Sequence, residues 1–199
     1  MKRATTIAIV FAAAATVAVA AAGPAAARDR CAVAGTETLR STPLVRVYLD
    51  DNLGSAVACS RASGRRTLLY EDDGYLSQGL IVGVAGRFVS YEWSSIPACK
   101  AACPPDVVGS SATEVANAAT GRIRRLEAFV VARVVLAPSG AAAWLSPPAP
   151  GLGSRTLSLW DAAGRRRLDQ GQIAPASVRR RGGRLRWTNG TRARSVPMP

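Results

Sequence analysis

Two stretches decide the fold: Leu136-Ala-Pro-Ser-Gly-Ala-Ala-Ala-Trp-Leu-Ser146 and Leu157-Ser-Leu-Trp-Asp-Ala-Ala-Gly-Arg-Arg-Arg-Leu168. Each places a turn that contains Gly between runs of apolar residues, and the second ends in a basic run. Asp161 stands at the first position of its turn, where a carboxylate accepts a backbone N–H, and Gly164 can take the positive φ that the returning strand requires. The segment Asn117-Ala-Ala-Thr-Gly121 has the same turn pattern, with Asn in place of Asp and one more residue before the glycine. These stretches are therefore predicted to be β-hairpins.

Two kinds of segment recur along the chain. Apolar strands flank a glycine in residues 81–93, 134–145 and 177–187, whereas a strand, a turn and a basic strand follow one another in residues 58–69, 115–126 and 159–168. The turn glycines are separated by 22, 35, 19, 24 and 19 residues, and they are Gly64, Gly86, Gly121, Gly140, Gly164 and Gly183. The long gap contains the proline-bounded segment 97–105, which is predicted to be an insertion in one repeat. Because no stretch holds a helical apolar period, an all-β fold of antiparallel sheets is predicted.

The stretches 136–146 and 157–168 resemble the repeat of TolB-type β-propellers. In that repeat an apolar strand follows a Pro-Asp-Gly-like turn, and a second hairpin carries Asp, Gly and a basic run that ends in Leu. Ser139 stands where the family usually has Asp. The chain also resembles uncharacterised exported actinobacterial proteins with such WD40-like repeats. The resemblance implies blades and a secreted or envelope setting, and it implies no activity.

The number of repeats predicts an incomplete array. Two full units span residues 79–126 and 129–168, with half units at residues 44–69 and 174–198 whose strands are complementary and can pair as a third sheet. A closed propeller needs about four blades or more. We therefore expect an incomplete propeller-like array of about three blades, or a sandwich, over residues 44–199, with residues 28–43 as an N-terminal tail.

The first 27 residues have the layout of a secretory signal peptide. Lys2 and Arg3 precede an uncharged run rich in Ala, Val and Ile, and Ala25-Ala26-Ala27 offers a small-x-small cleavage site. The apolar part of this run, residues 7–22, is shorter than the ~20 residues of a membrane span. Cleavage leaves 172 residues with a net charge of +11, long enough for one self-supporting core. We expect a protein of the extracellular space or cell envelope with no membrane span after cleavage.

Four cysteines lie in the exported part, which in an oxidising compartment indicates two disulfides. Of the three possible connectivities we favour Cys31–Cys59, which would fasten the N-terminal tail to a strand, and Cys99–Cys103, which would close a short proline-bounded loop at little entropic cost. The spacing of Cys31 and Cys59 fits no usual zinc knuckle, and no metal site or cofactor is predicted.

Arginine dominates the charge: the exported part has 23 Arg and one Lys. A G+C-rich genome and a solvated surface account for this composition, and polyanion binding is the functional alternative. The candidate polyanion-binding residues come from four basic runs and are Arg122, Arg124, Arg165, Arg167, Arg179, Arg181, Arg184 and Arg186. Residues that follow turn glycines in successive repeats can form a basic stripe, although alternate residues of a strand face opposite sides. Export and the scarcity of stacking aromatics argue against nucleic acid as the polyanion.

Catalysis has little support in the sequence. The chain has no histidine, so the Ser-His-Asp and Cys-His arrangements are excluded. Glycoside hydrolysis would need two converging carboxylates. The available acids include Asp50, Asp51, Glu71, Asp72, Asp73, Glu92, Asp106, Glu114, Glu127, Asp161 and Asp169. Glu92 has an aromatic setting between Tyr91 and Trp93, and strand alternation favours an outward-facing side chain there.

The sequence thus favours a secreted, non-enzymatic β-repeat protein that binds an anionic envelope polymer or another protein. The alternative is an exported carbohydrate-active enzyme that uses carboxylates between sheets. A propeller-like subunit that completes its ring by oligomerising is a third possibility. The residues do not specify the ligand or the oligomeric state.

Overall fold

The structure, a computed structural model, describes residues 29–50, 54–70, 76–96, 109–148, 151 and 153–199. Its elements in these residues are fifteen strands and one short 3-10 helix, η1 (Pro175–Ser177). No helix in this part of the chain has the length and apolar character needed to cross a bilayer. The strands form four antiparallel sheets, as the hairpin turns predicted. The fold is therefore all-β.

Each sheet is built from strands that follow one another in sequence. Sheet A consists of β1 (Thr36–Ser41), β2 (Val45–Asp50), β3 (Ser55–Ser60) and β4 (Arg66–Tyr70). Sheet B consists of β5 (Leu76–Ala85), β6 (Phe88–Ile96), β7 (Ser110–Asn117) and β8 (Arg122–Glu127). Sheet C consists of β9 (Arg133–Leu136), β10 (Ala142–Leu145), β11 (Arg155–Asp161) and β12 (Gly164–Gly171). Sheet D has three strands, β13 (Arg179–Arg181), β14 (Arg184–Asn189) and β15 (Arg192–Pro197).

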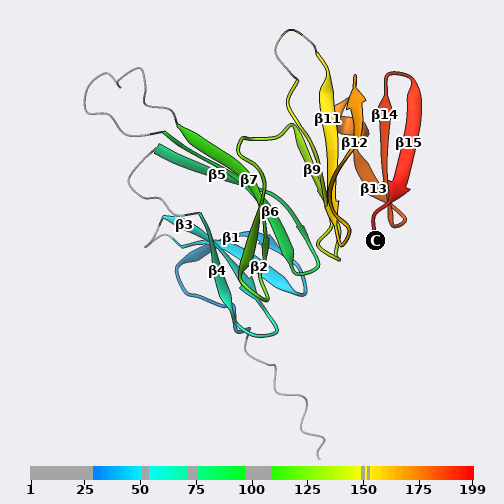
Figure 1. Cartoon of the computed structure of the whole chain (residues 1–199). Coiled ribbons are helices and arrows are strands. Elements are labelled where there is room, and N and C mark those ends of the chain that lie inside the picture. The colour runs from blue at the N-terminus through cyan, green and yellow to red at the C-terminus, as the bar shows by residue number, and fades with distance from the viewer. Residues whose placement is uncertain (1–28, 51–53, 71–75, 97–108, 149–150, 152) are drawn as a thin grey trace, which may run out of the picture.

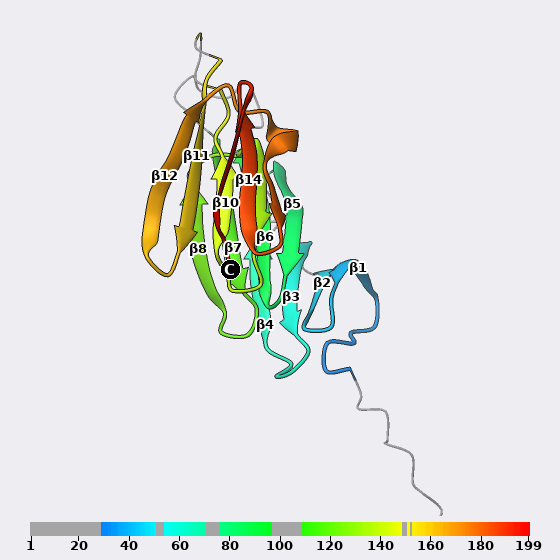
Figure 2. The same ribbon diagram turned by 90° about the vertical axis from the view of Figure 1, so that its right-hand side faces the viewer.

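The sheets are arranged in the order A, B, C, D, with sheet A at the lower left of Figure 1 and sheet D at the far right. The first strands of successive sheets contact one another: β1 contacts β5, β5 contacts β9, and β9 contacts β13. In the view turned by 90°, sheet D lies in front and the first strands of sheet A lie at the lower right (Figure 2). The result is an open, propeller-like array of sheets.

A separate apolar core joins each pair of neighbouring sheets. Val45 and Val47 of sheet A pack with Val89 and Tyr91 of sheet B. Between sheets B and C the core contains fully buried Trp144. The third core is the largest: sheets C and D share Ala143, Leu145, Leu157, Leu159, Val178, Leu185 and Trp187. Sheets B and C use both of their faces in this way, whereas sheets A and D each have one face that no other sheet covers.

The turn glycines occupy the predicted positions. All six have φ between +58° and +98°, a range that favours glycine. Gly86, Gly140 and Gly183 lie between the first and second strands of sheets B, C and D. Gly64 and Gly121 lie between the third and fourth strands of sheets A and B, and Gly164 begins the fourth strand of sheet C. The carboxylate of Asp161 accepts the N–H of Ala163 at 2.9 Å, and Asn117 Oδ1 accepts that of Ala119 at 3.0 Å. The two kinds of repeated hairpin are thereby confirmed.

The repeat count needs correction. The two predicted full units correspond to sheets B and C, but the two half units do not pair with each other, and the sheets number four instead of about three. Strand β1 lies within residues 28–43, which were predicted as a tail. It escaped prediction because its sequence, TETLRS, has no apolar alternation and only Leu39 packs on the core. Residues 1–27 and the segment 97–105 lie outside the described residues.

Candidate functional site

Four arginines share the outer face of sheet D. Leu185 and Trp187 of β14 are buried against sheet C, so the alternate residues Arg184 and Arg186 lie on the opposite face. The register places Arg181 directly opposite Arg184, and Arg179 directly opposite Arg186. All four are exposed. We call Arg179, Arg181, Arg184 and Arg186 the arginine face.

The chain does not neutralise this face. Residues 170–199 contain seven Arg and neither Asp nor Glu. Among the described residues, none of the four arginines forms an ion pair, and Arg184 donates to Ser195 Oγ at 3.1 Å. Like charges directly opposite each other in a sheet repel, at a cost of about 0.2–1 kcal/mol for each pair. An anion bound here would relieve that repulsion.

The chemistry of the face suits phosphate or carboxylate groups. A guanidinium is always charged and offers a planar fork of N–H donors that matches the oxygens of either group. A shallow hollow beside Arg179 and Arg186 is also lined by Ser177, Thr188 and Ser195. The hydroxyls of these residues add hydrogen-bonding capacity next to the charges. The arrangement can hold an extended polyanion without enclosing it.

The other four candidate arginines lie elsewhere, and two of them, although exposed, contact tryptophan rings of sheet C. The guanidinium of Arg124 lies 4.5 Å from the ring centroid of Trp160. Arg165 lies 5.1 Å from the ring centroid of Trp144 and pairs with Glu127 at 2.6 Å. Arg167 donates to Gln170 Oε1 at 3.3 Å, and Arg122 is exposed. The structure therefore brings together only the four candidates of sheet D.

Two carboxylates join neighbouring sheets through tryptophan, a feature that sequence reasoning missed. Glu127 ends β8 and accepts the indole N–H of Trp144 at 2.8 Å. Asp169 near the end of β12 accepts the indole N–H of Trp187 at 2.7 Å. Burial would raise the pKa of Asp169, but hydrogen bonds from Trp187, Gln170 and Asn189 hold this pKa below its ordinary value. The signal was present as Arg-Arg-Leu-Glu127 and Arg-Arg-Leu-Asp169, an acid after each basic run.

The described carboxylates do not form a converging catalytic pair in the hollows that the structure defines. Glu92 is half-buried, which raises its pKa, and the hollow around it is lined by Leu80, Trp93 and Val130 without a second acid. Glu114 is buried, accepts a hydrogen bond from Tyr91 Oη at 2.6 Å and pairs with Arg125 at 3.0 Å. Among the described residues, no three of the His, Cys, Asp and Glu side chains gather where they could hold a metal ion.

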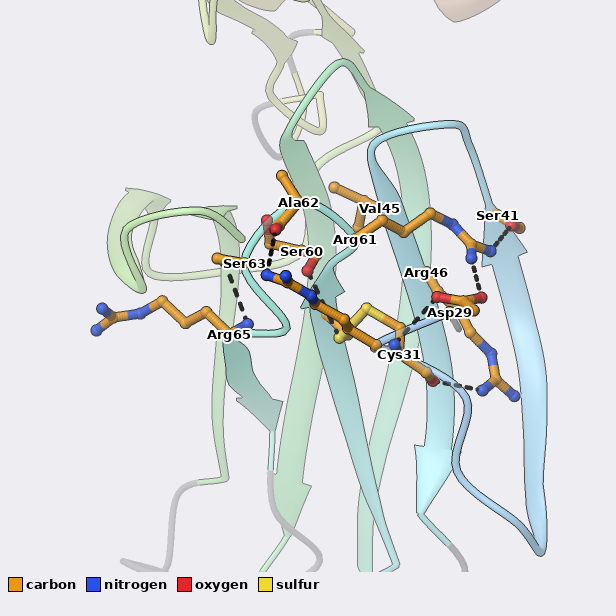
Figure 3. Close-up of a disulfide and its surroundings, with 12 residues drawn as sticks. Asp29, Cys31, Ser41, Val45, Arg46, Ser60, Arg61, Ala62, Ser63 and Arg65 are labelled. Atoms are coloured by element: carbon orange, nitrogen blue, oxygen red, sulfur yellow. Dashed lines mark hydrogen bonds and ion pairs between the residues drawn. A yellow bond between two sulfur atoms is a disulfide. The ribbon is translucent and has the colours of Figure 1, made fainter. Parts of the chain in front are cut away.

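The predicted disulfide Cys31–Cys59 is present, with a Cα–Cα distance of 5.7 Å, and it lies on the outer face of sheet A (Figure 3). Cys31, Cys59, Tyr48 and Val57 form a small buried cluster there. Arg46 Nη1 donates to the carbonyl of Cys31 at 2.7 Å, and Arg61 pairs with Asp29, so the N-terminal segment is held over the sheet. Cys99 and Cys103 lie outside the described residues.

Comparison with models of protein families and with curated proteins finds no match. Among solved structures, the chain is similar to a chain of a nidogen/laminin complex, with 20% identity, a TM-score of 0.36, and coverage of 77% of this chain and 56% of that chain. It is also similar to TolB from Acinetobacter baumannii, with 10% identity, a TM-score of 0.21, and coverage of 77% and 51%. The chain thus spans about half the length of these structures. Both scores are low, so the fold is defined by the strand order described above.

Proposed function

We propose that this protein is an exported, non-catalytic β-repeat protein that binds an anionic polymer of the cell envelope through the arginine face. The observation that carries the proposal is the pair of cross-strand contacts, Arg179 opposite Arg186 and Arg181 opposite Arg184, with no carboxylate beside them in the described residues. A sheet that only needed a solvated outer face would be more stable with mixed charges. A surface that binds polyanions requires such a concentration of positive charge.

Export supports an envelope polymer as the ligand. Residues 1–27 have the signal-peptide layout, and a disulfide such as Cys31–Cys59 persists in oxidising compartments outside the cytoplasm. The polyanions available there carry phosphate or carboxylate groups, which are the groups that arginine recognises. The resemblance of the sequence to exported repeat proteins agrees with this setting.

The test compares two variants of equal charge. In the first, the arginine face is changed by Arg179→Gln, Arg181→Gln, Arg184→Gln and Arg186→Gln. In the control, the exposed arginines of the other sheets are changed by Arg40→Gln, Arg66→Gln, Arg122→Gln and Arg133→Gln. Binding to soluble polyphosphate and to polygalacturonate is measured by titration calorimetry at low and at physiological ionic strength.

We expect the arginine-face variant to lose affinity by about tenfold or more, equivalent to about 1.4 kcal/mol, and the control variant to lose much less. Affinity of the unmodified protein should fall as salt rises, because the contacts are exposed charges. Equal losses in both variants would mean that net charge alone attracts the polymer, and the proposal would then be wrong. Failure of the unmodified protein to bind either polymer at low salt would also overturn it.

A further inference from the structure

Sheet D differs from the other sheets at its outer edge. Sheets A, B and C each have a fourth strand, whereas β15, the third strand of sheet D, has no neighbour on its far side in the part of the chain that the structure describes. All residues of β15 except Val196 are exposed. A strand edge of this kind presents unpaired N–H and C=O groups to which another strand can bond.

The hydrogen-bond pattern identifies the groups on that edge. Met198 donates to the carbonyl of Gly183 at 2.8 Å, and these residues stand opposite each other in the register of β14 and β15. Because hydrogen-bonded and non-hydrogen-bonded pairs alternate in an antiparallel ladder, Arg194 and Val196 bond to β14. Ala193 and Ser195 therefore direct their backbone groups away from β14, toward the outer edge, where the Ser195 carbonyl also accepts a long hydrogen bond from Arg184 Nη2 at 3.5 Å.

The β14–β15 ladder is also regular. In each complete sheet the pairing of the third and fourth strands contains a register shift, at Ala56/Val57, Thr113/Glu114 and Leu157/Ser158. Such bulges twist outer strands and discourage further pairing. The register of β14 and β15 runs from Arg184–Pro197 to Asn189–Arg192 without a shift. The edge of β15 thus lacks the bulge that accompanies the outermost strand of the other sheets.

Charge indicates what kind of strand fits this edge. In sheet B the third-strand acid Glu114 pairs with Arg125 of the fourth strand, and in sheet C Asp161 pairs with Arg166. In sheet D the polarity is reversed, because the third strand carries Arg192 and Arg194, of which Arg194 pairs with Asp169 of β12 at 3.4 Å. The other side of the sheet carries the arginine face, which adjoins Ser195 through Arg184 and Arg186. The edge is therefore basic through Arg192 on one side and the arginine face on the other.

We propose that the edge of β15 accepts an extended segment of a partner protein with acidic side chains at alternate positions, added antiparallel as the fourth strand of sheet D. Backbone hydrogen bonds to Ala193 and Ser195 give such a complex its affinity, and the arginines on either side select acidic segments. A second copy of this chain is disfavoured as the occupant, because Arg192 and Arg194 would face the same residues of the copy. This inference uses the edge of the sheet and stands apart from polymer binding by its face.

The test uses the full exported chain and a short peptide in which Glu alternates with Val. A second peptide has the same sequence with alternate amides N-methylated, and a third has Lys in place of Glu. The matched protein variants are Ala193→Pro, which removes one edge N–H without removing a bond to β14, and Ala193→Thr, which keeps that N–H. Binding is measured by fluorescence anisotropy, and exchange of the Ala193 and Ser195 amides is measured by NMR.

We expect the acidic peptide to bind and to slow exchange of both amides by about tenfold or more. N-methylation of the peptide and Ala193→Pro should each weaken binding by about tenfold, and Ala193→Thr should leave it unchanged. The Lys peptide should not bind. If the N-methylated peptide binds as well as the unmodified one, or if the edge amides exchange at the same rate with and without peptide, the edge does not accept a strand, while polymer binding by the face stays possible. Absence of binding by the acidic peptide would overturn the inference as well.

Discussion

The two end sheets treat their outer faces in opposite ways. On sheet A, Tyr48, Val57 and Cys59 form an apolar outer face that the disulfide-tethered N-terminal segment covers. On sheet D, the outer face carries the four arginines of the arginine face, and no described segment covers it. Both sheets use their inner faces for an apolar core with a neighbouring sheet. An end sheet can thus be covered by a segment of its own chain, as sheet A is, or carry an exposed polar face, as sheet D does.

The largest expected difference in stability between the two outer faces is the one between substitutions of Tyr48 on β2 and of Arg186 on β14, the second strands of sheets A and D. Tyr48→Ala should lower the free energy of unfolding by about 3–5 kcal/mol, because this side chain is 1% exposed and packs beside the disulfide. Arg186→Ala should change the same quantity by no more than about 0.5 kcal/mol, since Arg186 is exposed. Urea unfolding followed by tryptophan fluorescence measures both. Similar losses for the two variants would contradict the distinction between a covered and an open face.

The second prediction concerns the tether on sheet A. Replacing both cysteines, Cys31→Ser with Cys59→Ser, should cost about 3–4 kcal/mol, the expected range for a loop of this separation. The matched control is Cys99→Ser with Cys103→Ser, whose predicted bridge closes a much shorter loop and should cost about 2 kcal/mol. Thermal unfolding of the oxidised proteins gives the comparison. A smaller loss for the first variant than for the control would show that the tether is not what secures the outer layer of sheet A.

The smallest expected effect is a gain in protein stability from a substitution on sheet D. Arg181→Glu places an acid opposite Arg184 and should stabilise the protein by about 0.2–1 kcal/mol at low ionic strength, a gain that salt should screen. Arg180→Glu makes the same change of charge at the next residue, but Arg180 stands opposite buried Leu185 and donates to the carbonyl of Met198 at 3.0 Å. This control should lose stability. If both variants gain stability equally, the overall charge of sheet D determines this stability, and the cross-strand pairing of Arg181 with Arg184 does not.

The sequence was most informative where local chemistry decides the structure. Turn glycines require no knowledge of distant residues, and the Asp161 and Asn117 turns form as their side chains predict. The turn residues also made it possible to predict from the sequence which segments form sheets B and C. The disulfide Cys31–Cys59 was also predictable, because few connectivities compete when the cysteines are four. Strand β1 was not predictable by alternation. It is the edge strand of sheet A that contacts β5, and it buries little apolar surface.

The candidate site could be predicted only in part. The basic runs identify eight candidate arginines, but composition does not distinguish Arg165, which pairs with Glu127 and lies over Trp144, from Arg186, which forms no ion pair among the described residues. That distinction depends on which sheet follows in the array and on which face of the strand points toward it. A run of adjacent arginines contains residues of both kinds, so strand register has to be known before a binding face can be assigned.

The strictly sequential order of the strands has a consequence for how the chain acquires its structure. Among the described strands, every ladder joins neighbours in sequence, so none of these pairings has to wait for a segment from the far end of the polypeptide. Chain closure between such near neighbours costs little entropy, and folding can start in one hairpin and propagate in either direction. A chain that emerges from the ribosome with its N-terminus first can form each meander as it appears. Gain or loss of one repeat during evolution would lengthen or shorten the array without any need to re-thread it.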